Sequence, residues 1–338
     1  MALGLLILYH VVVSFQPWAR WIFFIQNDQS LPGLWVFMAL INVWRIPILF
    51  LISGMGVRFA MERRNWKELL EDRTVRILLP FVAGYLLICP ISVYLAQAYY
   101  GLSTSYVPNE GHLWFLANIF GYVVVLLPLL VYLKNRPDHP VMRGLAAVVR
   151  SPFGIGLFAL PPMIEAWLVN PASFATYAMT PHGFWLGMVC FFTGFLFVSL
   201  KDAFWQAVTR VRWVAMGGAA LLYLGRLVAF ELEGVPNWLI ALESMGWILA
   251  ILGFASVYLN RPSKNLTYFS RAVYPVYILH MPIQFLIAYG LLPLPLPAIL
   301  KLILLLIGTF GISLLAYEYV VRRLTWIRPL FGLTLTPN

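Results

Sequence analysis

A densely charged stretch, RFAMERRNWKELLEDRTVRILLPF, interrupts an otherwise apolar chain. Ten of the nineteen residues from Arg58 to Arg76 are charged, whereas charged residues make up 11% of the 338-residue sequence. Arg73 and Arg76 are three residues apart, so on a helix they share one face. Two guanidinium groups on one face can bind phosphate oxygens through paired hydrogen bonds. The alternative is a basic loop that only marks a membrane edge.

A second group of candidates consists of polar side chains inside long apolar segments, where a charge costs a few kcal/mol and usually faces a cavity or a partner. His10 could act as a proton-transfer group. Arg45 stands just before Pro47, a residue that bends a helix and often lies beside a polar cavity, so Arg45 could stabilise a developing oxyanion. The full set is His10, Arg45, Glu165, Arg226, Glu243, His280 and Gln284.

The simpler interpretation of these residues is structural. Glu165, Arg226 and Glu243 could join helices, for example through a buried Arg–Glu pair, and an isolated histidine in a core is more often structural than catalytic. His280 stays open between the two interpretations.

His112 and His182 stand at the starts of apolar segments, in EGHLWFL and TPHGFWLG. A helix start offers unpaired N–H groups, so polar residues there can simply be interfacial. We nevertheless expect His112, with Trp114 and His280, to contact a substrate. No two histidines have the spacing of metal ligands on one helix, so no metal site is predicted. The chain also contains no phosphate-loop, nucleophile-elbow or zinc-protease motif.

The elements that must hold these residues are membrane helices. Hydrophobic residues make up 62% of the chain, and long apolar stretches recur along nearly all of it, as in polytopic helical membrane proteins. We therefore predict an all-α, multi-pass membrane protein with a single domain over 1–338. Cys89 and Cys190 lie in apolar segments and are expected to be free thiols. The ten predicted spans are 2–17, 34–57, 77–98, 113–133, 152–169, 183–200, 213–230, 238–259, 273–291 and 299–320.

The basic residues predict the orientation. Alternate loops and the C-terminal tail carry nineteen Lys and Arg residues, whereas the opposite loops carry only Arg20 and Lys301. By the positive-inside rule, both termini should be cytoplasmic. The net charge of +10 fits contact with anionic membrane lipids, and no soluble basic and aromatic segment suggests nucleic-acid binding.

Several short pieces occur in an order that resembles the membrane-bound acyltransferase family 3. They are LILYH, FLISG at 50–54, RTVRILLPF at 73–81, GHLWFL at 111–116 and YPVYILHMP at 274–282. Within the family, the chain is most similar to the branch that includes glucan biosynthesis protein C, and the closing AYEYVVRRLTWIRPLFG adds to this resemblance.

The resemblance implies transfer of an acyl group, such as acetyl or succinyl, from cytoplasmic acyl-coenzyme A to a hydroxyl of an extracytoplasmic glycan. It implies a location in the bacterial inner membrane. His10 matches the histidine of the family's Arg-x10-His motif, the proposed catalytic base, and Arg73 and Arg76 match the Arg-x-x-Arg motif proposed to hold the coenzyme A phosphates. The arginine of the first motif would precede Met1, and the short first apolar run is consistent with an upstream segment.

Two other classes of function remain open from the sequence. A transporter or flippase for a glycolipid or acyl carrier could use the same apolar helices without doing chemistry. A membrane scaffold for a glycan-synthesis complex would leave the intramembrane charges with little purpose. His10 separates the first alternative from a transferase, because a transporter could keep its activity with glutamine at this position.

Overall fold

All regular secondary structure is helical over the residues that the structure describes, 2–261 and 263–335 of a computed structural model. The predicted all-α class is therefore confirmed. Met1, at which the question of an upstream segment arises, lies outside the described residues.

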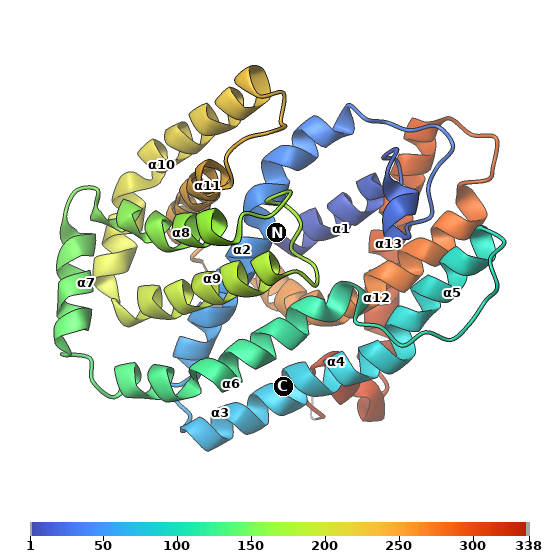
Figure 1. The fold of residues 1–338 in the computed structure, drawn as a ribbon. Coiled ribbons are helices and arrows are strands. Elements are labelled where there is room, and N and C mark those ends of the chain that lie inside the picture. The colour runs from blue at the N-terminus through green and yellow to red at the C-terminus, as the bar shows by residue number, and fades with distance from the viewer. Residues whose placement is uncertain (1, 262, 336–338) are drawn as a thin grey trace. The chain divides into compact units, whose positions relative to one another are not determined.

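The chain forms two compact units, and each is assembled from separated stretches of sequence (Figure 1). Unit 1 contains the chain up to Met38, residues Asp72–Ala117 and the segment from Ser263 onward. Unit 2 contains Ala39–Glu71 and Asn118–Pro262. Helices α2 (Leu34–Ala60), α3 (Trp66–Arg73) and α6 (Trp114–Lys134) each run from one unit into the other.

Unit 1 is organised around α12 (Lys264–Leu291), which packs beside α13 (Ala298–Ala316) and α5 (Cys89–Tyr99). Helix α1 (Ala2–Val13) packs against both α12 and α13. Apolar side chains at spacings of three and four residues form the shared core. Its members include Ile7, Val11, Phe15, Phe285 and Leu305. The remaining elements of the unit are η1 (Ala19–Ile22), η2 (Thr74–Leu78), α4 (Leu79–Ala83), η3 (Gly84–Ile88), η4 (Gly111–Leu113), η6 (Tyr317–Val321) and η7 (Thr325–Phe331).

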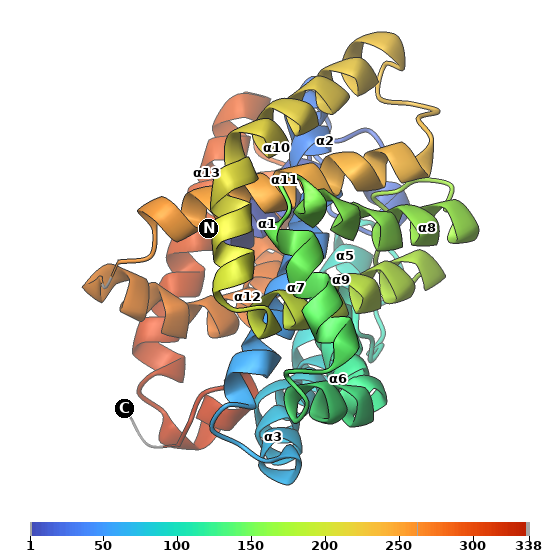
Figure 2. The same cartoon turned by 90° about the vertical axis from the view of Figure 1, so that its left-hand side faces the viewer.

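Unit 2 contains α9 (Pro181–Ser199) and the adjacent pair α10 (Asp202–Ala229) and α11 (Asn237–Tyr258), which pack side by side (Figure 2). It also contains α7 (Pro140–Arg150), η5 (Gly154–Ala159) and α8 (Leu160–Val169). Within a bilayer, helices associate through close packing, and small residues let their backbones approach.

Gly54 of the FLISG motif is such a small residue. A Cβ atom at Gly54 would lie 1.8 Å from the carbonyl oxygen of Phe191, and one at Gly194 would lie 1.9 Å from that of Leu51. Helices α2 and α9 therefore meet backbone to backbone at two glycines, and a larger residue at either position would push them apart.

Eight helices in the described residues are long and apolar enough to cross a membrane. They correspond to eight of the ten predicted spans, so the multi-pass character is confirmed. The predicted span 2–17 is only twelve residues long as α1, and Pro17 follows in the turn after it. The predicted span 152–169 belongs to a helix pair, Pro140–Arg150 and Gly154–Val169, that is bent by 119°. Ser151-Pro152 separates the two parts, and proline disfavours a helical conformation in the residue before it.

The charged stretch is more helical than the sequence predicted. A continuous helical run extends over Trp66–Tyr99, whereas the predicted span was 77–98. Two π-helical turns, η2 and η3, come just before Pro80 and Pro90. A proline ring clashes with the carbonyl four residues earlier, and widening the helix by one residue relieves that clash. Arg73 ends α3 and Arg76 lies on η2, so both arginines are on this helical run.

Candidate active site

His10 and His280 meet in unit 1, although they are 270 residues apart in sequence. The Nδ1 atom of His10 lies 2.9 Å from the Nε2 atom of His280. The two rings are nearly parallel, at 7°, with centroids 5.2 Å apart. His280 is fully buried, whereas His10 is partly exposed. The imidazole of His10 is therefore held against that of His280, and the rings of Tyr9 and Phe24 also contact it.

His112 joins this cluster from the 3₁₀-helical turn η4. Its ring is almost perpendicular to that of His280, with centroids 4.9 Å apart. Its Nε2 atom lies 3.1 Å from the carbonyl oxygen of Tyr277 and 3.0 Å from that of Ile278. Pro282 has no N–H with which to bond the Ile278 carbonyl, as a helix would otherwise require. His112 fills this role, so the proline explains why a histidine binds the side of α12.

Gln284 fixes the backbone of His10 from the same helix. Its side-chain nitrogen donates to the carbonyl oxygen of His10 at 2.8 Å and lies 3.4 Å from Oγ of Ser14. His280 and Gln284 are four residues apart, so they share one face of α12. This face of α12 therefore contacts both the side chain and the backbone carbonyl of His10.

The two arginines of the charged stretch lie on one helical run and share an acidic neighbour. Nε of Arg76 is 3.0 Å from Oδ1 of Asp72, and a terminal nitrogen of Arg73 is 3.9 Å from Oδ2 of the same carboxylate. The Arg76 side chain is 44% exposed, so it can reach a solvent-borne ligand. The Arg73 side chain is less exposed, at 18%, so the shared phosphate contact of the two arginines stays a prediction.

Gly332, in the C-terminal segment, packs against the backbone of Arg76. Its φ is +70°, a left-handed conformation that favours glycine. A Cβ atom here would lie 2.3 Å from the ring of Tyr274 and 3.0 Å from the carbonyl oxygen of Arg76. The backbone after η7 therefore packs directly on the turn that carries Arg76.

Arg45, the proposed oxyanion donor, lies in the part of α2 that belongs to unit 2. It is buried, and a terminal nitrogen donates to Oδ1 of Asn42 at 3.0 Å. Pro47 cannot donate to the carbonyl of Val43, and the Tyr177 hydroxyl donates to that oxygen instead, at 3.1 Å. The helix thus continues through Pro47, because a side chain from another segment replaces the missing backbone donor.

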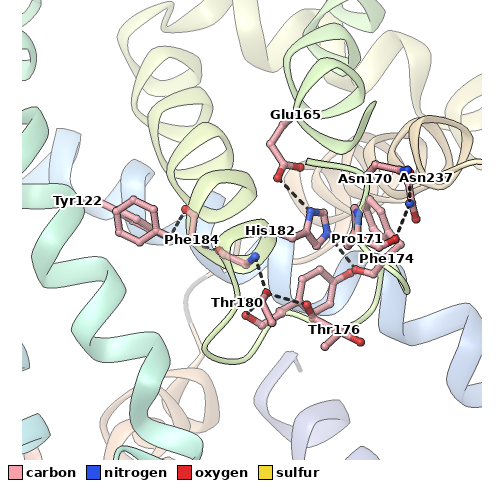
Figure 3. A network of polar contacts seen from close by, with 12 residues as sticks. Tyr122, Glu165, Asn170, Pro171, Phe174, Thr176, Thr180, His182, Phe184 and Asn237 are labelled. Atoms are coloured by element: carbon pink, nitrogen blue, oxygen red, sulfur yellow. Dashed lines mark hydrogen bonds and ion pairs between the residues drawn. The ribbon is translucent and has the colours of Figure 1, made fainter. Parts of the chain in front are cut away.

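A second buried pair, Glu165 and His182, lies in unit 2 (Figure 3). Nδ1 of His182 is 3.0 Å from Oε1 of Glu165, and Nε2 is 3.0 Å from the carbonyl oxygen of Phe174. Thr180 caps α9 by accepting from the N–H of Gly183 at 3.0 Å. His182 is thus buried and bonded, whereas the sequence allowed it to be interfacial. The sequence singled out both residues but offered no signal that they form a pair.

Arg226 and Glu243 form the ion pair that the structural interpretation anticipated. Nε of Arg226 lies 2.8 Å from Oε2 of Glu243, and a terminal nitrogen lies 3.0 Å from Oε1. The same terminal nitrogen donates to the carbonyl of Ala39 at 2.9 Å, and Trp247 donates to Glu243 at 3.3 Å. This buried pair is hydrogen-bonded on several sides, which is the condition under which a buried pair is tolerated.

Trp114 begins α6 two residues after His112 and is largely buried. The expected substrate contacts of His112, Trp114 and His280 remain predictions. Among the described residues, no group of three or more His, Cys, Asp or Glu side chains could hold a metal ion. Cys89 and Cys190 are both free and buried.

Taken together, the long apolar helices and the cluster of His10, His112 and His280, in the unit that also carries Arg73 and Arg76, describe a multi-pass membrane protein with polar side chains packed among its helices. A family model described as an acyltransferase domain matches residues 1–318. The chain belongs to acyltransferase family 3. No curated protein and no solved structure matches it.

Proposed function

We propose that the protein is a membrane O-acyltransferase that moves an acyl group, such as acetyl or succinyl, from cytoplasmic acyl-coenzyme A to a hydroxyl of an extracytoplasmic glycan. Membership of an acyltransferase family supports the transfer of an acyl group. The observation that carries the proposal is the contact between the imidazoles of His10 and His280, in the unit that also carries Arg73 and Arg76. The resemblance to the glucan branch suggests a glucan acceptor and the bacterial inner membrane.

His10 is proposed as the general base. A sugar hydroxyl is a weak nucleophile, so its oxygen attacks a thioester faster when a base takes the proton at the same time. A C–O bond forms to the acyl carbon and the C–S bond to coenzyme A breaks. The thiolate that leaves takes the proton from His10, which returns the base to its starting state.

The arginines are proposed to bind the donor. The nucleotide end of coenzyme A carries phosphates, and guanidinium groups bind phosphate oxygens through charge-assisted hydrogen bonds. Arg45 is proposed to stabilise the negative charge that develops on the carbonyl oxygen. His112 and Trp114 are proposed to contact the acceptor.

The test is a transfer assay with the purified protein in lipid vesicles. Acetyl- or succinyl-coenzyme A labelled in the acyl group is supplied on the side of the membrane that carries the charged stretch 58–76. A glucan is supplied on the opposite side. We expect labelled ester on the glucan and free coenzyme A in equal amounts. Movement of an intact glycolipid across the bilayer without ester formation would overturn the proposal and favour a flippase.

A further inference from the structure

The hydrogen-bond partners of His280 decide which of its nitrogens carries a proton. Nδ1 of His280 lies 2.6 Å from the carbonyl oxygen of Tyr277, three residues earlier on α12. A carbonyl oxygen can only accept, so Nδ1 must donate and therefore holds a hydrogen. The other nitrogen, Nε2, is then a lone-pair acceptor in a neutral ring.

The neutral ring is the one that the surroundings favour. His280 is fully buried, and its neighbours are backbone carbonyls and two further imidazoles, those of His10 and His112. A positive charge taken out of water is costly unless an anion compensates it. Nε2 of His280 therefore accepts a hydrogen bond, and the donor 2.9 Å away is Nδ1 of His10.

The assignment at His10 follows directly. If Nδ1 of His10 carries the hydrogen that it donates to His280, its lone pair is on Nε2. Gln284 holds the carbonyl of the same residue at 2.8 Å, so α12 fixes both the backbone and the ring orientation. The basic nitrogen of His10 is then the one that points away from His280.

We infer that His280 is a positioning residue that holds His10 in the tautomer with Nε2 as its basic nitrogen, so that an acceptor hydroxyl must approach His10 from its Nε2 side. The positioning role rests on the proposed function, because it concerns the base of that reaction. The tautomer of His10 can be measured in the protein without substrate. It gives His280 a task different from the substrate contact that the sequence suggested. His280 need not touch any substrate to act in this way.

The first test compares two substitutions of His280. In His280→Gln, the side-chain oxygen can still accept from Nδ1 of His10, whereas in His280→Leu no acceptor remains. We expect kcat to fall about 10–100-fold in the leucine variant, the usual scale for losing a group that orients a catalytic side chain, and less in the glutamine variant. The KM for acyl-coenzyme A should stay unchanged in both. Equal kcat values for the leucine variant and the wild type would overturn the inference.

The second test needs no turnover. Nitrogen NMR of histidine-labelled protein in lipid distinguishes protonated Nδ1 from protonated Nε2, and the His10 signal is assigned by its loss in His10→Asn. We expect His10 protonated at Nδ1 in the wild type and shifted toward the other tautomer in His280→Leu. His139→Ser is the matched control, because His139 lies at the start of α7 in unit 2 and serine also caps helices.

The two failures can be told apart. Wild-type protein that shows His10 protonated at Nε2 would overturn the positioning role, whatever its activity. Wild-type protein with the expected tautomer but no acyl transfer would overturn the proposed function and leave the role of His280 standing. If His280→Leu does not fold, the wild-type spectrum and the glutamine variant still decide the question.

Discussion

Asp72 forms an ion pair with Arg76 one helical turn later, with Oδ1 3.0 Å from Nε. The contact is made by Nε and so restrains the orientation of the guanidinium group. Asp72 is largely buried while Arg76 is 44% exposed. The carboxylate therefore holds the arginine from the protein side, while much of the arginine side chain stays exposed.

Replacing Arg73 or Arg76 by alanine should weaken binding of acyl-coenzyme A, because each change removes charge-assisted hydrogen bonds to phosphate. A hydrogen bond to a charged group contributes about 1.5–3 kcal/mol, which corresponds to roughly 10–100-fold in Kd. Lysine should restore only part of the affinity, since it lacks the planar fork. Titration calorimetry measures the effect. Arg63→Ala and Arg64→Ala are the controls, and equal losses at all four positions would indicate diffuse electrostatic attraction instead of a defined site.

Replacing His10 by alanine should separate binding from chemistry. The arginines remain, so acyl-coenzyme A should bind as before, whereas loss of a general base typically lowers the rate about 10²–10⁴-fold. Thermal unfolding, donor binding and acyl transfer should be measured on one preparation. A purely structural histidine would instead lower the unfolding temperature first. Normal acyl transfer by a stable His10→Ala protein would remove His10 from the mechanism.

Substitutions of Arg226 and Glu243 should have strongly non-additive effects on the free energy of unfolding. Arg226→Met alone should destabilise the protein by about 3–5 kcal/mol, because it leaves the Glu243 carboxylate buried without its partner. The double substitution Arg226→Met, Glu243→Met should recover most of that loss. Reversible denaturation of the purified protein gives the free energies of unfolding. A double variant as unstable as the sum of the two single variants would argue that the two side chains act independently.

Glu165 offers a comparison of two substitutions of similar size. Leucine would leave Nδ1 of His182 buried without a partner, at a cost of about 1–3 kcal/mol. Glutamine should retain most of the stability, because its amide nitrogen can donate to Nδ1 while Nε2 still donates to Phe174. The free energy of unfolding of each variant distinguishes the outcomes. An equal loss in both would show that the pair requires a charged carboxylate.

The orientation of the chain can be tested by labelling single cysteines. Because Cys89 and Cys190 are buried, they should contribute little background. By the positive-inside rule, a cysteine at Arg63 should be protected from a membrane-impermeant maleimide in intact cells, whereas one at Ser103 should react. Labelling at Arg63 from outside would reverse the proposed orientation, and with it the side from which acyl-coenzyme A must enter.

Much of the fold follows from the sequence, because the energy of placing apolar residues in a bilayer depends on local composition. Eight predicted spans form membrane-length helices for this reason. Two of the predicted spans differ from the structure, one in its length and the other in its straightness. One, α1, is short with Pro17 in the turn beyond it, and the other is bent by 119° beside Pro152. Local composition identifies an apolar segment, but the prolines around it help decide how much of it is one straight helix.

The sequence by itself also drew attention to His10, because a titratable residue stands out in an apolar segment, whereas Arg73 and Arg76 were selected among their charged neighbours by the resemblance to acyltransferase family 3. It could not show that His280 faces His10, since the two residues are 270 positions apart and nothing in their spacing relates them. Only the packing of α1 on α12 brings them together, and only Pro282 leaves the carbonyl oxygen of Ile278 for His112 to bind. Hydrogen-bond partners depend on which helix faces meet, and that information is absent from local sequence. The tertiary structure therefore supplied the contact with His280 from which we infer the tautomer of His10.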